Sequence, residues 1–372
     1  MKFTAKKSTL LDGLKTISGA VANKSTLPIL TNIILEASDD HLELVATDLE
    51  VSIETKTPAS IQEEGSCTIP AKKLRRLVNE LPSSDTLLEF TLEGDSKAEI
   101  NVEETTSSFE MPVLDREEYP SLPQVGEGTS FELPAETLEH ILNHSTFAAG
   151  TDTSRSYLCG VYFDINDSQL NVVSTDAHRL AKHEAELEQS DLDLSLLVPT
   201  QASKELSKIL RDAEEDTVHI HTDEQLVEFK TDSTRMVSRL IDEDFPDYNQ
   251  VIPQDYEKRM TVDRDRFLDA VRRVSLMADE KTRRLLIEVD SSELTVRAET
   301  SEEGGGEEIL DINYKGDPQK IAFNGDYLQA VLKHIEDDEI YFDLISEDSP
   351  GTFRPMEAED NYLYIIMPLR LN

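Results

Sequence analysis

The sequence contains no tryptophan and only two cysteines, Cys67 and Cys159. The cysteines are far apart and do not have the spacing of a metal-binding motif, so we expect reduced core thiols in a cytoplasmic protein. No stretch approaches the roughly 18 consecutive apolar residues of a transmembrane helix. Residues 1–17 also lack the continuous apolar core of a signal peptide. These absences predict a protein with no membrane contact and no secretion signal.

Positive charge is also scarce, because 36 Lys and Arg residues face 76 Asp and Glu residues, for a formal net charge of −40. Phosphate binding needs a basic surface, so the net charge by itself argues against a nucleic-acid partner. The acidic residues are dispersed along the chain and not gathered in one tail. Such dispersal is typical of a surface that stays soluble in concentrated salt. We interpret it as a halophilic acidic surface; the alternative is an ordinary acidic protein.

One pattern occurs three times in the 372 residues. Each copy opens with an amphipathic helix, near residues 8, 135 and 264, which a polar loop connects to two apolar runs. Asp, Ser or Asn joins the two runs, as in a β-hairpin. A second helix and further strands close each copy. The copies read "PILTNIILEASDDHLELVATD", "YLCGVYFDINDSQLNVVSTD" and "RRLLIEVDSSELTVRAET" in their hairpins.

The repeat predicts an α+β protein whose helices cover one face of antiparallel sheets. Polar stretches with Gly or Pro at their edges lie near 125–129 and 254–258, which are suitable linkers. We therefore expect three domains, an N-terminal one over 1–126, a central one over 127–254 and a C-terminal one over 255–372.

The scarce positive charge is concentrated on the predicted helices. With short flanks, the six helices carry a net charge of +8, which leaves −48 for the rest of a chain whose total is −40. One interpretation is that bases suit helix ends and salt-bridged faces. The other is that the helices line a surface that faces a polyanion while acidic sheets face outward.

Several blocks resemble the β sliding clamp of bacterial DNA polymerase III, in the same order and over the whole chain. They are "MKFT", "TLPILTNIILE", "LVATDLEVSI", "TDAHRLA", "FPDYNQVIP", "EEILDINY" and "YIIMPLRL". The resemblance implies three clamp domains per chain and a head-to-tail homodimeric ring, with helices inside and sheets outside. It implies no catalytic activity and no cofactor. The residues themselves predict no metal site: the run "EDDE" at 336–339 is interpreted as a solvated helix end, and divalent-cation binding there is the alternative.

The resemblance also implies the partners. The ring would encircle double-stranded DNA without sequence specificity, be placed there by a clamp loader, and hold the replicative DNA polymerase and other clamp-binding proteins. Phosphate contacts weaken with salt, but a closed ring stays on circular DNA even where they are weak. A basic lining then only has to prevent repulsion between the ring and the DNA, so DNA binding is compatible with the negative net charge of the chain.

Clamps of this family bind short extended peptides, which contain Gln and large apolar residues, in a pocket between the second and third domains. Met, Leu, Ile and Pro give an adaptable apolar wall, and Thr, His and Arg could fix polar groups of the peptide. Ala177 stands where the family commonly has Gly. The matching pocket positions are Arg155, Leu158, Thr175, His178, Arg179, Leu180, Pro246, Val251, Ile365, Met367, Pro368, Leu369 and Arg370.

Two further sets of residues are predicted. Lys24 and Lys72 match positions where the family places basic contacts to phosphate, and Tyr157 lies on a matching loop. Helix bases are added by charge alone. These bases are Lys204, Lys208, Arg272 and Arg273, and the alternative for each is a solvated helix face. The positions that match the dimer interface are Lys73, Leu77, Phe109, Met111, Leu276 and Met277.

Rival functions rest on fewer residues. A hydrolase could use Asp48 and Asp176, which occupy equivalent repeat positions, but the third repeat has Thr300 there. His178 as a general base lacks a spaced nucleophile or carboxylate. His219 and His221 share one strand face, but no third metal ligand is evident. A secreted calcium-binding repeat protein would need a signal and spaced Asp/Asn/Gly loops, and neither is found.

Overall fold

The computed structural model describes residues 1–92, 94, 96–103, 105–213, 217–253, 258–300, 304–356 and 361–371. It divides into two compact units. One comprises Met1–Glu139 with Lys204–Leu240, and the other comprises His140–Ser203 with Ile241–Asn372. Within the described ranges, none of the helices combines the length and the apolar character that crossing a membrane requires.

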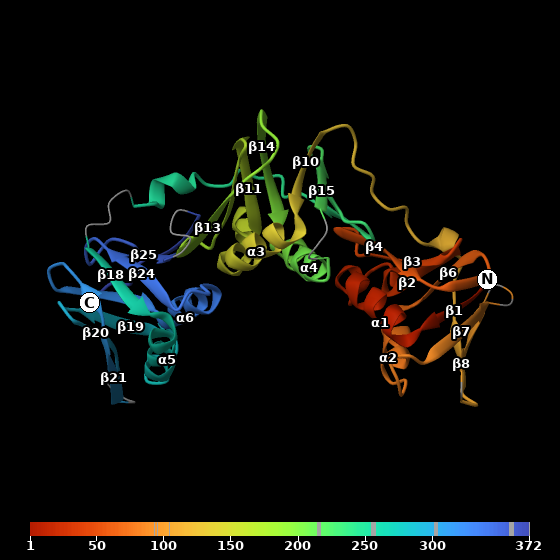
Figure 1. Ribbon diagram of the computed structural model, residues 1–372, viewed down its shortest axis with the longest axis horizontal. Coiled ribbons are helices and arrows are strands. Elements are labelled where there is room, and N and C mark those ends of the chain that lie inside the picture. The colour runs from red at the N-terminus through yellow and green to blue at the C-terminus, as the bar shows by residue number, and fades with distance from the viewer. Residues whose placement is uncertain are drawn as a thin grey trace. The chain divides into compact units, whose positions relative to one another are not determined.

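The first unit contains two antiparallel sheets (Figure 1). The smaller has five strands in the order β5 (Ser60–Glu63), β1 (Lys2–Lys6), β7 (Leu87–Leu92), β8 (Lys97–Val102) and β9 (Ser108–Pro112). The larger has eight, in the order β10 (Thr129–Pro134), β15 (Thr217–Thr222), β16 (Leu226–Lys230), β17 (Thr234–Arg239), β4 (Val51–Pro58), β3 (His41–Thr47), β2 (Asn32–Ser38) and β6 (Gly65–Pro70).

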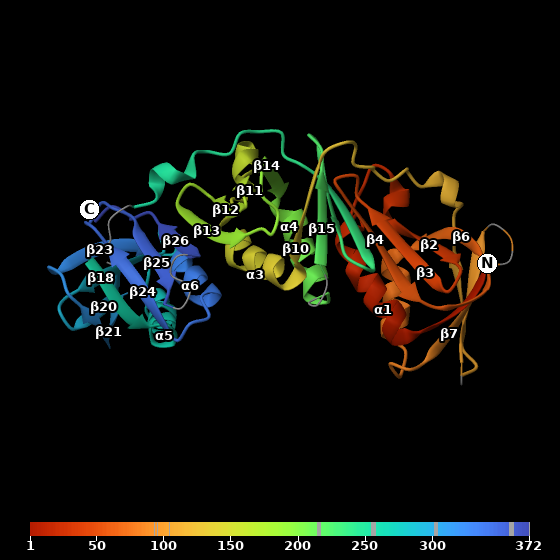
Figure 2. The same ribbon diagram turned by 45° about the horizontal axis from the view of Figure 1, so that its top comes forward.

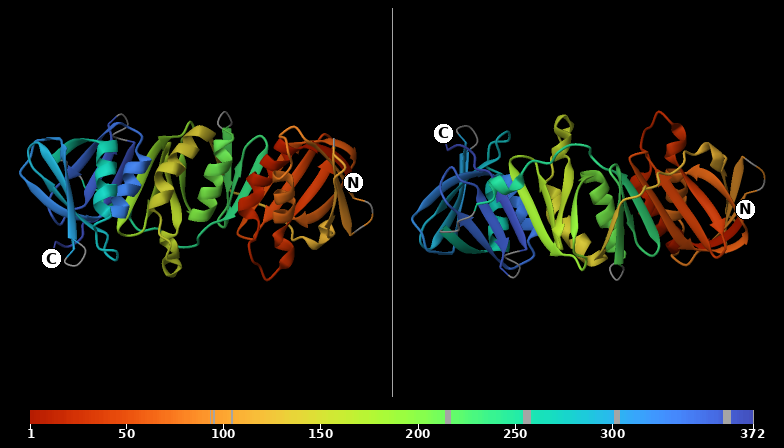
Figure 3. Two further views of the ribbon diagram at one scale, coloured as in Figure 1. Left: turned by 90° about the horizontal axis from the view of Figure 1, so that it is seen from below. Right: turned by 90° about the horizontal axis from the view of Figure 1, so that it is seen from above.

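Two helices lie side by side on the sheets of the first unit, α1 (Lys7–Thr16) and α2 (Ala71–Asn79) (Figure 3). Each is held by one apolar stripe, because residues three or four apart lie on the same helix face. Leu10 and Leu14 are buried on α1, and Leu74 and Val78 on α2. The 3-10 turns of this unit are η1 (Ile17–Ala20), η2 (Pro28–Thr31) and η3 (Arg116–Glu118).

The second unit also has two sheets. The larger contains nine strands in the order β14 (Leu192–Pro199), β11 (Gly160–Asp167), β12 (Gln169–Thr175), β13 (Arg179–Glu186), β26 (Tyr362–Ile366), β25 (Gly351–Pro355), β24 (Glu339–Leu344), β18 (Lys258–Asp263) and β22 (Asn313–Tyr314). The smaller contains β21 (Gly304–Asp311), β20 (Glu293–Thr300), β19 (Arg284–Val289) and β23 (Gln319–Asn324).

Helices α5 (Arg264–Ser275) and α6 (Gly325–His334) pack on these sheets around an aromatic core. Phe342 and Phe353 stack with ring centroids 4.2 Å apart. The first turn of each helix is capped: Asp263 accepts a hydrogen bond from the Arg266 amide, and Asn324 accepts one from the Asp326 amide. Helices α3 (Ala135–Ser145) and α4 (Thr200–Arg211) run across the division between the units, and the remaining 3-10 turns are η4 (Thr146–Ala148), η5 (Thr153–Leu158) and η6 (Tyr248–Val251).

The six predicted helices and the three predicted hairpins are confirmed. Strand pairing also joins neighbouring repeats, which the repeat pattern in the sequence does not predict. Strand β17 pairs with β4, and β13 pairs with β26, so that each large sheet joins strands of two repeats (Figure 2). The proposed linker at 125–129 ends at Thr129, the first residue of β10, and the one at 254–258 lies almost wholly outside the described residues.

Candidate functional site

An apolar cavity of about 260 Å³ opens in the second unit beside the β13–β26 joint. It is formed where η5, the β12–β13 turn, η6 and the segment after β26 meet. Val251 and Met367 keep 42% and 38% of their surface exposed, so both side chains are available to a ligand. The lining residues are Tyr157, Leu158, Thr175, Ala177, Arg179, Leu180, Pro246, Asp247, Tyr248, Val251, Ile365 and Met367.

Aromatic packing around Tyr248, the first residue of η6, supports the wall of this cavity. The ring of Tyr248 is buried, and its hydroxyl donates to Asp164 Oδ2 at 2.6 Å. Burial, together with this hydrogen bond to a carboxylate, raises the pKa of Tyr248 well above its usual range. Beside it, the rings of Tyr162 and Phe245 stack on each other with their centroids 4.7 Å apart. The apolar wall therefore rests on rigid side chains.

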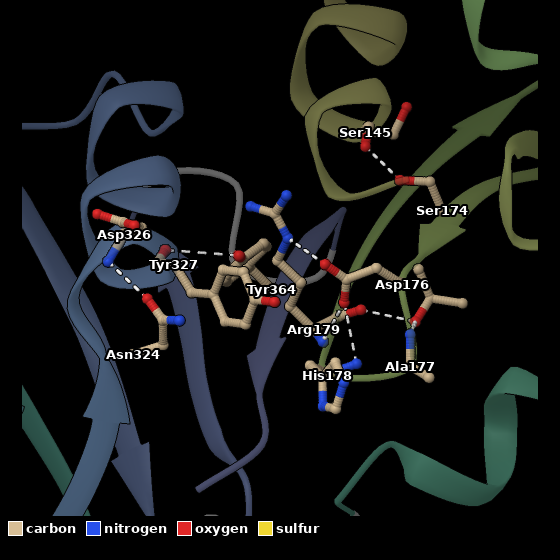
Figure 4. Close-up of polar contacts among 11 residues, drawn as sticks. Ser145, Ser174, Asp176, Ala177, His178, Arg179, Asn324, Asp326, Tyr327 and Tyr364 are labelled. Carbon is tan, nitrogen blue, oxygen red and sulfur yellow. Dashed lines mark hydrogen bonds and ion pairs between the residues drawn. The ribbon is translucent and has the colours of Figure 1, made fainter. Parts of the chain in front are cut away.

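The β12–β13 turn is held by side-chain hydrogen bonds to its own backbone (Figure 4). Asp176 Oδ1 accepts from the amides of His178 and Arg179 at 2.9 and 3.0 Å. Thr175 Oγ1 donates to the Arg179 carbonyl at 2.6 Å. These bonds hold Ala177 at φ +74°, a left-handed conformation that favours glycine. The position that departs from the family pattern is thus a strained one.

Arg179 lines both the apolar cavity and a more polar one of about 340 Å³. Its Nε donates to Asp176 Oδ2 at 3.0 Å, and its guanidinium lies 4.6 Å from the centroid of the Tyr327 ring (Figure 4). This cation–π contact orients a charge that is only partly exposed. The polar cavity is lined by Ala149, Gly150, Thr151, Asp152, Arg155, Leu158, Asp176, His178, Arg179 and Tyr327.

Ten of the thirteen predicted pocket residues therefore line one of two adjoining cavities, with Arg155 and His178 in the polar one. The segment that follows β26 is held against the rest of the second unit by backbone hydrogen bonds. The Met367 amide donates to the His178 carbonyl at 2.8 Å, and the Leu369 amide donates to the Ala322 carbonyl at 2.7 Å. The predicted pocket residues that line neither cavity are Pro368, Leu369 and Arg370.

Family models of the DNA polymerase III beta subunit match nearly the whole chain. The N-terminal domain model matches residues 1–123, the central model 132–247 and the C-terminal model 249–370. The chain belongs to the beta sliding clamp family. It is therefore a DNA sliding clamp of replication, built from three clamp domains, and a processivity factor, not an enzyme.

Relatives and solved structures agree over the full length. The beta sliding clamps of Synechocystis and Chlamydia pneumoniae are 32% and 30% identical, each with complete coverage of both chains. A crystal structure of the sliding clamp from Pseudomonas aeruginosa bound to griselimycin is 29% identical with a TM-score of 0.94. The Bacillus subtilis clamp is 29% identical with a TM-score of 0.91, again with complete coverage of both chains.

The predicted DNA-facing bases differ in how free they are. Arg273 makes a bidentate pair with Glu308, at 2.6 and 2.7 Å. Lys208 pairs with Glu205 at 2.9 Å, and Arg272 lies 3.4 Å from Asp269. The other predicted lysines are exposed: Lys24, Lys72 and Lys204. Tyr157 lines the apolar cavity, so we add it to the pocket residues.

Helix α2 carries basic side chains without carboxylate partners among the described residues, and the predicted set of DNA-facing residues includes only Lys72 of them. Its apolar stripe is buried, and its four bases point away from that stripe and are exposed. Lys72 bonds the amide oxygen of Asn23 at 2.8 Å. Within the described ranges, no carboxylate pairs with Lys73, Arg75 or Arg76. The sequence feature that indicates this basic surface is "KKLRR", in which two pairs of bases flank the buried Leu74.

The predicted dimer residues are mostly accessible. Leu276 and Met277, beyond the end of α5, are 78% and 41% exposed, and Phe109 on β9 is 36% exposed. Lys73 is exposed and Leu77 is half-buried. The prediction of Met111 as an interface residue is corrected, because its side chain is only 2% exposed and packs inside the protein, where it has no surface to offer a partner.

The rival sites have structural roles. Asp48 bonds the amides of Glu50 and Val51 at 3.0 and 2.8 Å, just as Asp176 bonds its own turn. Both carboxylates therefore stabilise equivalent hairpin turns.

Of the two cysteines, which were both predicted to be core thiols, only Cys67 is buried. Burial raises the pKa of the Cys67 thiol to about 12, whereas Cys159 is half-exposed.

The two strand histidines are also engaged. His219 Nδ1 lies 2.7 Å from a carboxylate oxygen of Glu132. His221 uses both ring nitrogens, with Nδ1 bonding Ser130 Oγ at 2.8 Å and Nε2 bonding the Gly126 carbonyl at 2.9 Å. A ring with both nitrogens occupied has no lone pair to offer a metal ion.

Proposed function

We propose that two copies of this chain form a closed head-to-tail ring around duplex DNA and tether the replicative polymerase through the apolar cavity. The observation that carries the proposal is the match to all three clamp domains along one chain. A ring holds DNA by topology, so the charge of −40 is no obstacle to this function. A clamp loader would open the ring, and the cytoplasm is the compartment where these partners meet.

Head-to-tail assembly is supported by two open sheet edges. Strand β9 ends the five-stranded sheet and β21 ends the four-stranded sheet, and neither has a second partner strand among the described residues. An unpaired edge offers backbone donors and acceptors to another chain. Met277 packs against Gly306 of β21, its neighbour Leu276 is exposed, and Phe109 lies on β9, so these side chains would give the contact an apolar core. We therefore propose that β9 of one copy meets β21 of the next.

The cavities suit a short extended peptide. Leu180, Pro246 and Ile365 belong to an apolar wall that would take large apolar side chains. Arg155 and His178, in the adjoining polar cavity, would bind the peptide's amide or carboxylate groups. Met367 at the rim has three rotatable bonds, so it can adapt to peptides of different shape.

Loading on nicked circular DNA tests the ring. The protein is loaded by a clamp loader and ATP, freed of loader, and followed by gel filtration with the circle intact or cut once. We expect retention on the intact circle and rapid release after linearisation. Retention that is the same on both templates would show ordinary binding and overturn topological linkage. A linear template blocked at both ends is the control, and it should retain the protein.

A further inference from the structure

A group of three histidines lies in the second unit, outside the two cavities. His140 and His144 come from α3, and His183 comes from β13. The ring centroids of His140 and His144 are 4.0 Å apart, and those of His140 and His183 are 5.2 Å apart. His144 and His183 are 5% and 9% exposed, whereas His140 is exposed. Residues four apart share a helix face, so both α3 imidazoles point the same way.

Glu336, just beyond the end of α6, completes a set of possible metal ligands. One ligand atom each from His140, His144 and Glu336 lies within 4.8 Å of the others. In a tetrahedral zinc site, bonds of about 2.0–2.2 Å place neighbouring ligand atoms roughly 3.3–3.6 Å apart. The two groups at the surface, His140 and Glu336, have the freedom to close this difference by side-chain rotation.

The buried ring is already oriented as a ligand. His144 Nδ1 lies 2.7 Å from the His140 carbonyl oxygen. A carbonyl only accepts, so Nδ1 carries the proton and Nε2 keeps its lone pair. Metal-binding histidines commonly have one nitrogen fixed in this way by a backbone carbonyl. Among the residues that the structure describes, no donor occupies His144 Nε2.

A second feature beside the cluster calls for a polar ligand. The Tyr362 hydroxyl is buried and has no hydrogen-bond partner within the described part of the chain. Its ring centroid lies 5.4 Å from that of His144 and 5.8 Å from that of His183. An unpaired buried hydroxyl is unfavourable by about 1–3 kcal/mol. A water molecule on a bound cation would give this hydroxyl a partner.

We propose that His140, His144 and Glu336 bind a divalent cation of the zinc class, with water in the fourth position. Two imidazoles and one carboxylate suit Zn²⁺, Co²⁺ or Ni²⁺ better than Mg²⁺ or Ca²⁺, which prefer oxygen ligands. The ion would tie α3 to the end of α6 and so brace the β13–β26 joint. This role does not depend on the proposed ring.

Cobalt provides the test, because tetrahedral Co²⁺ has a characteristic visible spectrum and replaces zinc. The full-length protein is titrated with Co²⁺ in excess Mg²⁺, which occupies the many surface carboxylates. We expect one equivalent with tetrahedral bands, displaced by one equivalent of Zn²⁺. The variants H140N and E336Q alter exposed side chains, and each should weaken Co²⁺ binding by about tenfold or more.

The matched control is H219N, which removes an exposed histidine that also lies beside a glutamate. It should leave the spectrum and the affinity unchanged. Absence of tetrahedral bands in the unaltered protein would overturn the proposal. So would bands that persist at full affinity in both H140N and E336Q, or an equal loss in H219N. Zn²⁺ should also raise the unfolding temperature of the unaltered protein and not that of H140N.

Discussion

Ala177 illustrates how a single residue can store strain in the cavity wall. Alanine at φ +74° is unfavourable, because its Cβ crowds the backbone where glycine has none. We expect Ala177→Gly to raise the free energy of unfolding by roughly 0.5–1 kcal/mol, measured by urea denaturation. Ala330→Gly in α6 is the control and should lower it by about 0.8–1 kcal/mol. Equal effects of both substitutions would contradict a strained turn.

Met367 and Met356 form a matched pair for testing the cavity. They are 38% and 37% exposed, but only Met367 lines the cavity. We expect Met367→Ala to weaken binding of a polymerase peptide about tenfold, or roughly 1.4 kcal/mol, because part of a buried methionine contact is lost. Fluorescence anisotropy with a labelled peptide measures this. Met356→Ala should change nothing, and an equal loss there would disprove the assignment.

Point substitution is a sharper test than removal of the C-terminal segment. The amides of Met367 and Leu369 are bonded to the body of the protein. Truncation would remove these bonds as well as the cavity wall, so lost peptide binding and lost stability could not be separated. The sequence shows that the C-terminal segment is apolar, but it does not show which backbone groups of the protein this segment bonds.

The bases on helix α2 predict how much this helix contributes to DNA binding. Lys72 and Arg75 lie on the same helix face, with no carboxylate paired to either among the described residues. Each phosphate contact contributes about 0.9 to the slope of log K against log salt. We expect Lys72→Ala with Arg75→Ala to make the slope shallower by about 1.8, measured on a short duplex.

The control for this prediction is a pair of bases already neutralised within the protein. Arg272 and Arg273 pair with Asp269 and Glu308. Their double alanine variant should change the slope by less than half as much as the α2 variant. A larger effect from this pair would show that DNA displaces the intramolecular ion pairs.

The sequence predicts the elements better than their connections. Helix α5 is evident from its apolar spacing and from the cap at Asp263, both of which are local. The pairing of β13 with β26 depends on two edges that are remote along the chain, and hydrophobic alternation does not specify which edge a strand will join. The histidine cluster was missed for the same reason. "HILNH" shows two ligands, but Glu336 approaches them only through the fold.

For the whole molecule, charge repulsion should control assembly. Two chains of −40 carry −80 together. The screening length is roughly 30 Å at 10 mM salt and 3 Å at 1 M. We expect the dimer to dissociate or loosen at 10 mM salt and to be stable above 1 M, as measured by sedimentation velocity. An unchanged dimer at both would contradict this, and sucrose at 10 mM salt should not restore the dimer if screening is the cause.

The pairing of β26 between β13 and β25 has a consequence for synthesis. A ribosome adds roughly 5–20 residues per second, so β13 waits on the order of ten seconds or more for its neighbour. During that time the nascent chain presents an open strand edge, which can pair wrongly with another copy. Slow translation late in the message should therefore lower the yield of native protein even though the finished sequence is unchanged.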